Sequence, residues 1–155
     1  MIQETKHLSY DDTGDLNDLV EQVIALFSHR FGDVEFRQEV MPTVRTDPFL
    51  MEHVFSNLVD NALKYLDPSR AGEIVIGGEK DEDEAHFFVR DNGIGLNEDN
   101  IDVFKLFKQA DETNKGAGVG LALVTTMLAK LGGRIWHESN DVHGTTFMFC
   151  VPLDR

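Results

Sequence analysis

One short motif, Asp91-Asn92-Gly93-Ile94-Gly95-Leu96, places a carboxylate and two glycines directly after an apolar run, Phe87-Phe88-Val89. The apolar run predicts a strand, so Asp91 should lie where that strand ends and the backbone turns. A carboxylate is a fixed hydrogen-bond acceptor, and glycine lets a ligand approach the main chain closely. A flat ligand with an amino group, such as adenine, meets both conditions. An ordinary turn also favours Asp, Asn and Gly, so the motif alone leaves both interpretations open.

A second motif is a polar stripe formed by Asn57, Asn61 and Lys64, which are four and three residues apart. This spacing puts all three on one side of a predicted helix whose other residues are strongly apolar. A stripe facing solvent would explain Lys64, but asparagine is a poor residue for a helix interior. An asparagine oxygen can bind Mg²⁺, which completes its shell with water and phosphates, and a lysine can contact the same phosphates. We therefore favour a metal and phosphate role for this stripe.

A third motif is the glycine run Gly116-Ala117-Gly118-Val119-Gly120, which precedes a predicted helix. Bare backbone amides at a helix N-terminus favour anions. The spacing differs from the dinucleotide fingerprint, which also follows a strand directly, and no Gly-Lys-Ser/Thr of a P-loop is present. The run is therefore a candidate phosphate-binding segment of another kind.

Composition narrows the function classes. The chain has 155 residues, 41% hydrophobic and 27% charged, which fits one globular domain with a single core. A net charge of −14 makes nucleic-acid binding unlikely, although three of the seven lysines, Lys105, Lys108 and Lys115, lie close together. No apolar run is long enough for a membrane helix, and the single Cys150 is expected to be a core residue in a reducing compartment.

These motifs require elements to position them. Hydrophobic periodicity and turn signals predict three helices, over Asp15–Phe31, Pro48–Leu66 and Val119–Leu131. Asp47 is the expected N-cap of the second helix, with Pro48 in its first turn. The predicted strands are Val34–Val40, Glu73–Gly78, Ala85–Arg90, Arg134–Glu138 and Thr145–Val151.

The order of these elements predicts an α+β fold. We expect a two-layer α/β sandwich with a mixed, mainly antiparallel sheet of about five strands and about three helices on one face. The turn at Lys80–Glu84 is acidic but lacks the calcium-loop pattern, so we interpret it as solvated. Residues 1–14 are expected to be a tail or a linker from an upstream domain. The polar stretch between Leu96 and Gly116 is expected to be a functional lid.

In chain order, the motifs resemble the Bergerat-fold ATP-binding domain, and most closely the catalytic domain of sensor histidine kinases. The resemblance extends over Asp15–Leu153. The corresponding segments are an N box at Asn57–Tyr65, a first glycine box at Asp91–Leu96, an F box at Phe104–Phe107, a second glycine box at Gly116–Leu121, and a final strand that begins Gly144-Thr145-Thr146-Phe147.

The resemblance implies a base-recognition role for one group of residues. Asp91 would accept a hydrogen bond from the adenine amino group, and Thr145 would form hydrogen bonds nearby. Gly93 and Gly95 belong to the same box, with Gly95 at the close approach to the base. Tyr65 would pack on the purine.

The same resemblance implies metal, phosphate and lid roles. Asn61 would bind Mg²⁺ with Asn57 in support, and Lys64 would contact a phosphate. Many relatives carry an arginine shortly after the second lid phenylalanine, whereas Lys108 is the nearest cation here, so Lys108 or Lys115 is expected to substitute for it. The other residues assigned to the phosphates and the lid are Phe104, Phe107, Gly116, Gly118, Val119, Gly120 and Leu121.

Asn57 decides among the relatives of this fold. Gyrase-like ATPases place a glutamate four residues before the metal asparagine, where it activates water, and an amide cannot act as that base. Phosphoryl transfer depends mainly on positioning and charge stabilisation, so a protein-histidine kinase is the expected class, with Asn57, Lys64 and Lys108 as catalytic candidates. The alternatives are a nucleotide-sensing module, an anti-sigma-type serine kinase and, less favoured, a gyrase-like ATPase.

The resemblance also implies partners that this sequence does not contain. The phosphoacceptor would be a histidine on a separate helical-hairpin dimerisation domain, and a response-regulator receiver domain would act downstream in a two-component system. None of the chain's own histidines begins such a hairpin; they are His7, His29, His53, His86, His137 and His143. The domain is expected to be cytoplasmic, without direct membrane contact, and a membrane anchor elsewhere in the parent protein stays an open alternative.

Overall fold

Helix-capping and periodicity signals produce three helices in a computed structural model that describes residues 16–95, 117–140 and 143–153. They are α2 (Leu16–Arg30), α3 (Pro48–Lys64) and α5 (Ala117–Leu131). Asp47 caps α3 as predicted, because its Oδ1 accepts hydrogen bonds from the amides of Phe49 at 2.9 Å and Leu50 at 3.4 Å. The expected tail and lid lie outside the described residues.

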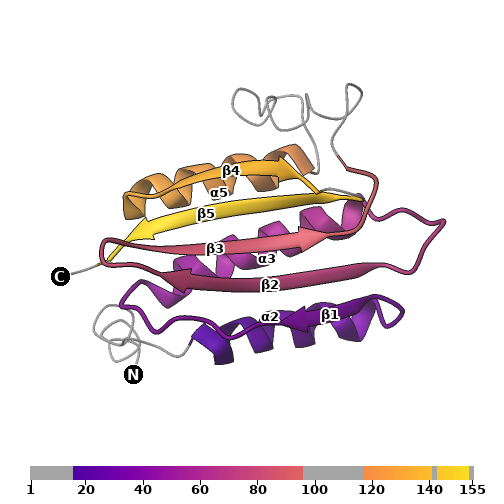
Figure 1. Ribbon diagram of the computed structural model, residues 1–155, viewed down its shortest axis with the longest axis horizontal. Helices are drawn as coiled ribbons and strands as arrows, with labels where there is room; N and C mark the ends of the chain where they lie inside the picture. The colour runs from indigo at the N-terminus through magenta and orange to yellow at the C-terminus, as the bar shows by residue number, and fades with distance from the viewer. Residues whose placement is uncertain (1–15, 96–116, 141–142, 154–155) are drawn as a thin grey trace.

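The described strands form one five-stranded sheet in the order β1-β2-β3-β5-β4. Their bounds are β1 (Glu35–Gln38), β2 (Glu73–Lys80), β3 (Glu84–Asp91), β4 (Arg134–Ser139) and β5 (Thr145–Pro152). β1 runs parallel to β2, and the other neighbouring pairs are antiparallel. The predicted mixed, mainly antiparallel sheet is therefore confirmed (Figure 1).

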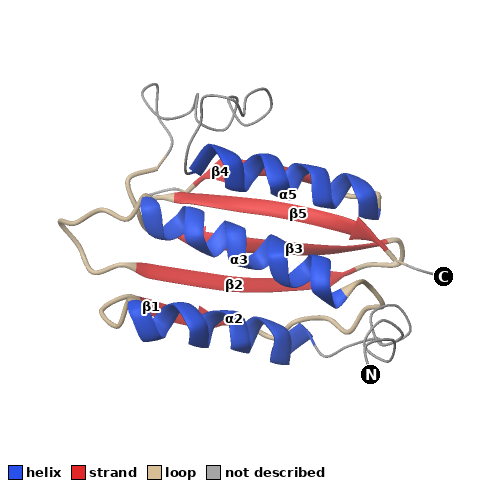
Figure 2. Cartoon of the chain, turned by 180° about the vertical axis from the view of Figure 1, so that it is seen from behind, coloured by secondary structure: helices blue, strands red, loops and turns tan. Residues whose placement is uncertain are grey.

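The three described helices cover one face of this sheet (Figure 2), which confirms the two-layer sandwich. Strand alternation explains the arrangement, since Ala85, Phe87, Val89 and Asp91 of β3 are buried while the residues between them are partly exposed. At the centre of the core, Phe87 stacks on Phe149 and Phe55 of α3 meets both rings edge-on.

Element boundaries differ from the sequence prediction by a few residues. α3 ends at Lys64 rather than Leu66, α5 begins at Ala117 rather than Val119, and β1 is shorter than the predicted Val34–Val40. Helix ends and edge strands are set by tertiary contacts that local sequence does not report. No helix in the described ranges has the length and apolar character needed to cross a membrane.

Candidate nucleotide-binding site

Asp91 is the last residue of β3, where the sequence predicted it, and alternation turns its side chain toward the helix layer. The residue is 5% exposed. Its Oδ1 accepts hydrogen bonds from the amides of Gly93 at 2.8 Å and Thr145 at 3.3 Å. Both bonds end on Oδ1, so the described donors leave Oδ2 for a ligand. The geometry is that of a fixed acceptor at the edge of the core.

The electrostatics of Asp91 favour a hydrogen-bonding ligand. Burial raises the pKa of this carboxyl to about 6, and the hydrogen bonds from Gly93 and Thr145 offset only part of that rise. A donor group placed at Oδ2 would stabilise the ionised form and lower the pKa again. The site therefore gains electrostatic stability when a donor such as an amino group arrives.

The fold itself requires a glycine at position 93. A Cβ at this position would lie 2.1 Å from the carbonyl oxygen of Tyr65, the C-cap of α3. The next residue, Ile94, donates its amide to the same Tyr65 oxygen at 2.9 Å. The turn after β3 and the end of α3 are thus held in direct backbone contact, which brings the first two sequence motifs together.

Gly95 and Gly144 both have positive φ, at 81° and 88°. A Cβ on Gly144 would lie 2.0 Å from the Asp91 carbonyl oxygen, so the start of β5 approaches the end of β3 closely. This approach is what allows the Thr145 amide to reach the Asp91 carboxylate. Thr145 itself is 4% exposed and lies beside Asp91, and its predicted role at the base stays a prediction.

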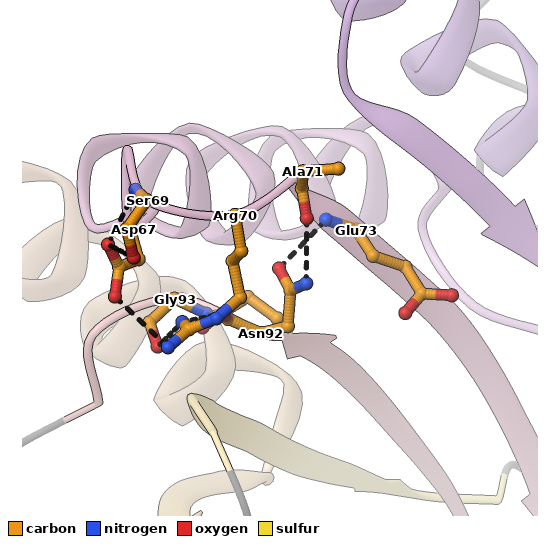
Figure 3. A network of polar contacts seen from close by, with 8 residues as sticks. Asp67, Ser69, Arg70, Ala71, Glu73, Asn92 and Gly93 are labelled. Atoms are coloured by element: carbon orange, nitrogen blue, oxygen red, sulfur yellow. Dashed lines mark hydrogen bonds and ion pairs between the residues drawn. The ribbon is translucent and has the colours of Figure 1, made fainter.

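Sequence reasoning missed the residues that fix this corner. Figure 3 shows Arg70 donating to the carbonyl oxygens of Asn92 at 2.8 Å and Gly93 at 3.2 Å while it pairs with Asp67. The Asn92 side chain bridges the preceding segment, accepting from the Glu73 amide and donating to the Ala71 carbonyl. The Asp67-Pro68-Ser69 turn was the available signal, because Asp67 there forms a local Asx turn with Ser69.

Asn140 is a further missed residue. Its Nδ2 donates to the carbonyl oxygens of Asp91 at 2.8 Å and His143 at 2.9 Å, and its Oδ1 accepts from the Thr146 hydroxyl at 2.6 Å. Asn140 thereby ties the loop before β5 to the end of β3. Its position just after a predicted strand gave only a weak turn signal.

The polar stripe on α3 divides into three environments. Asn61 is 6% exposed, and its buried Oδ1 has no hydrogen-bond partner among the described residues. Asn57 is half-buried and donates its Nδ2 to the His53 carbonyl oxygen at 2.7 Å. Lys64 is exposed and pairs with Asp60 at 3.4 Å. An unpartnered buried oxygen is costly, so Asn61 fits a cation ligand whereas Lys64 needs to leave Asp60 to reach a phosphate.

α5 packs against α3, the helix that carries this stripe. Gly118, Val119 and Gly120 fall in the first turn, where backbone amides have no partner within the helix. Leu121 is the fifth residue, so its amide can bond the Ala117 carbonyl, and its side chain is in the core at 2% exposed. Phe104, Phe107, Lys108 and Gly116 lie outside the described residues, so their predicted roles stay predictions.

The fold and the residues around Asp91 define a nucleotide-binding domain of the Bergerat class: an open sheet, three described helices on one face, a buried carboxylate at the end of β3, and a glycine-rich start of α5. A family model described as "Histidine kinase-, DNA gyrase B-, and HSP90-like ATPase" matches residues 46–155, and the chain belongs to that family. The resemblance predicted from the motifs is confirmed.

Histidine kinases are among the similar proteins. The chain is 42% identical over 115 residues to the methanogenesis regulatory histidine kinase FilI of Methanothrix harundinacea, a match over 74% of this chain and 13% of that protein. It is 29% identical over 154 residues to BarA of Escherichia coli, over 90% of this chain and 17% of that protein. The chain therefore spans less than a fifth of the length of these two relatives.

Solved structures agree in fold. The catalytic domain of histidine kinase ThkA has a TM-score of 0.73 and 26% identity, with 90% of this chain and 93% of that chain covered. Full-length ShkA, solved in complex with AMPPNP, has a TM-score of 0.73 and 28% identity, with 90% of this chain and 30% of that chain covered. These likenesses confirm the predicted fold class.

Proposed function

We propose that this domain transfers the γ-phosphoryl group of ATP to a histidine on a separate helical-hairpin domain. The observation that favours transfer over hydrolysis is Asn57. It occupies the position of the water-activating glutamate in gyrase-like relatives, and its amide is bonded to the His53 carbonyl oxygen. An amide has no basic lone pair suited to proton abstraction at neutral pH. The nucleophile is then activated on the partner domain.

Asp91 recognises the adenine base in this proposal. Its Oδ2 faces the ligand while Gly93 and Thr145 hold Oδ1, so the acceptor direction is fixed before ATP binds. Tyr65 packs on the purine from the end of α3, next to the turn that its carbonyl oxygen anchors. Together with Gly95, these residues bind and orient the base without taking part in bond breaking.

Asn61 binds Mg²⁺ in this proposal, because its buried Oδ1 has no partner in the described part of the chain and a neutral oxygen suits this ion. Bound Mg²⁺ would neutralise charge on the phosphates during transfer. Asn57 supports Asn61 from one helical turn away. The amides of the first turn of α5 hold the phosphate chain, and Lys64 and Lys108 supply positive charge.

The biological setting follows from the same proposal. The proposed location is the cytoplasm, within a longer two-component kinase that signals to a receiver domain; the use of ATP and the single cysteine, Cys150, support it. The acidic surface, with a net charge of −14, argues against a nucleic-acid partner.

The test is phosphoryl transfer from labelled ATP and Mg²⁺ to the parent protein's histidine-hairpin domain, with a hairpin variant lacking the acceptor histidine as control. We expect acid-labile, base-stable label on the hairpin domain, none on the control, and little free phosphate. Rapid release of phosphate without phosphohistidine would refute the proposal in favour of a gyrase-like ATPase. ATP binding without transfer would favour a nucleotide-sensing module.

A further inference from the structure

In Figure 1 the strands lie in front of the helices, so the sheet face opposite the helices is turned toward the viewer. A second group of reactive side chains lies on this face. His86 on β3 and Cys150 on β5 are directly paired across the two strands, so their side chains share this face. Glu84 lies two residues before His86 and therefore points to the same side. None of these residues belongs to the nucleotide corner, since Asp91 lies at the opposite end of β3 and faces the helices.

The donor atoms of this group are close enough to share one ion. His86 Nε2 lies 3.5 Å from Glu84 Oε1, and Cys150 Sγ lies 3.8 Å from Glu84 Oε2. The three donor atoms all lie within 4.8 Å of one another. In a tetrahedral zinc site, bonds of about 2.0–2.3 Å separate neighbouring donors by about 3.3–3.7 Å. The two separations from Glu84 are near that range. The third, between His86 and Cys150, is at most 4.8 Å and would be shortened by rotation of the side chains.

Asp81, in the turn between β2 and β3, lies near His86 but outside the group of three residues whose donor atoms are all within 4.8 Å of one another. Its Oδ2 lies 3.5 Å from His86 Nε2. Its Oδ1 accepts the amides of Asp83 and Glu84, each at 2.8 Å, and these two bonds fix the carboxylate with Oδ2 toward His86. One turn carboxylate is thus held in place beside the three-residue cluster.

We propose that Glu84, His86 and Cys150 form a Zn²⁺ site, which Asp81 completes as a fourth ligand when its turn moves closer. A thiolate, an imidazole and carboxylates are the ligand types that zinc accepts, and thiolate excludes Mg²⁺ and Ca²⁺. The bound ion would tie the β2–β3 turn to the last strand of the sheet. Zinc binding would release the Cys150 thiol proton, since the metal binds the thiolate.

Arg134 is the competitor for this site. Its guanidinium pairs with Glu84 Oε2 at 3.1 Å from the facing position on β4, where it also opposes Cys150 in register. Without metal, this ion pair and the contacts of His86 with Asp81 and Glu84 hold the cluster together. The Arg134 side chain is 61% exposed, so it is free to swing into solvent when a cation arrives. Removing its charge should therefore strengthen zinc binding.

The test is Co²⁺ titration of the nucleotide-free domain, without an affinity tag, followed by displacement with Zn²⁺. Cys150 is the only cysteine in the chain, so a thiolate-to-cobalt charge-transfer band can come only from this site. We expect that band at one equivalent of Co²⁺, together with the strong visible bands of four-coordinate cobalt. Zn²⁺ should abolish both.

Three variants separate a metal site from a purely structural cluster. His86→Gln, at a side chain 33% exposed, should fold and bind at least about tenfold more weakly. His29→Gln, at an exposed position on α2, is the matched control and should bind like wild type. Arg134→Gln should bind about tenfold more tightly because a nearby positive charge is gone.

Absence of the charge-transfer band in wild type would overturn the zinc proposal, as would equal Co²⁺ affinity in His86→Gln and His29→Gln. Cys150→Ser, a buried change, should remove the band if the variant folds. ATP titrations of the same proteins report on the nucleotide corner separately, so failure of the zinc site and failure of the kinase proposal are distinguishable.

Discussion

Burial of Asp91 opposes ionisation of its carboxyl group, whereas the proposed recognition of adenine requires the ionised form. Its carboxyl is 5% exposed and has a pKa raised to about 6, yet its proposed role requires an ionised acceptor at neutral pH. The amides of Gly93 and Thr145 make ionisation possible, and a ligand donor would complete the compensation. The nucleotide-free domain therefore stores an electrostatic cost that ATP binding can relieve.

This cost predicts a pH dependence of stability. The folded pKa of Asp91 is about 6 and the ordinary value is 3.8, so the folded state holds the proton more tightly between these pH values. The contribution of Asp91 to stability is therefore greatest below about pH 4, and it is lost as pH rises to about 6. Its total is about 3 kcal/mol, from about 1.4 kcal/mol per pKa unit.

Urea unfolding of wild type and Asp91→Asn at several pH values between 4 and 7.5, without nucleotide, measures this contribution. The amide of Asp91→Asn does not titrate, so only wild type should lose this contribution as pH rises. We therefore expect the free energy of unfolding of Asp91→Asn to increase relative to that of wild type through this window. Parallel pH profiles for the two proteins would show that the buried carboxyl does not titrate as described.

At the scale of elements, the site depends on the backbone contact between the end of α3 and the turn after β3, which we call the joint. The Tyr65 carbonyl oxygen accepts the Ile94 amide, and Arg70 and Asn92 fasten the same turn to the segment between α3 and β2. The end of α3, which follows the stripe of Asn57, Asn61 and Lys64, and the turn after β3 are therefore parts of one connected unit.

Gly93→Ala tests this joint. The added methyl group would lie 2.1 Å from a backbone oxygen, which cannot move as a side chain can, so the turn must shift. We expect a loss of about 1–3 kcal/mol in the free energy of unfolding and weaker ATP binding. Gly32→Ala is the control, because its nearest neighbour is 4.0 Å away. Equal effects of the two substitutions on the free energy of unfolding and on ATP affinity would contradict the proposed importance of this contact.

Local signals explain what the sequence could predict. The Asp47-Pro48 cap and the apolar run before Asp91 depend on neighbours along the chain, so the start of α3 and the place of Asp91 at the end of a strand were predicted correctly. The contacts of Arg70 and Asn140 join residues 22 and 49 positions apart, and no local pattern encodes them. Gly93 was assigned to ligand approach, whereas the fold already requires a glycine there.

At the scale of the whole molecule, the two proposed binding sites lie on opposite faces of the sheet. Its helix-covered face holds the nucleotide corner, and its open face holds the proposed zinc cluster (Figures 1 and 2). β3 contributes to both, with Asp91 at one end and Glu84 and His86 at the other. The chain spans 13% of FilI and 17% of BarA.

The central claim, that Asp91 reads adenine in one ATP site, is tested most directly by calorimetric titration of wild type and Asp91→Asn with ATP and GTP. GTP presents a carbonyl oxygen where ATP has its amino group, so the carboxylate should reject it. We predict that wild type strongly prefers ATP, and that Asp91→Asn loses about 10- to 100-fold in ATP affinity and most of that preference. Unchanged ATP affinity in a folded Asp91→Asn domain would contradict the claim.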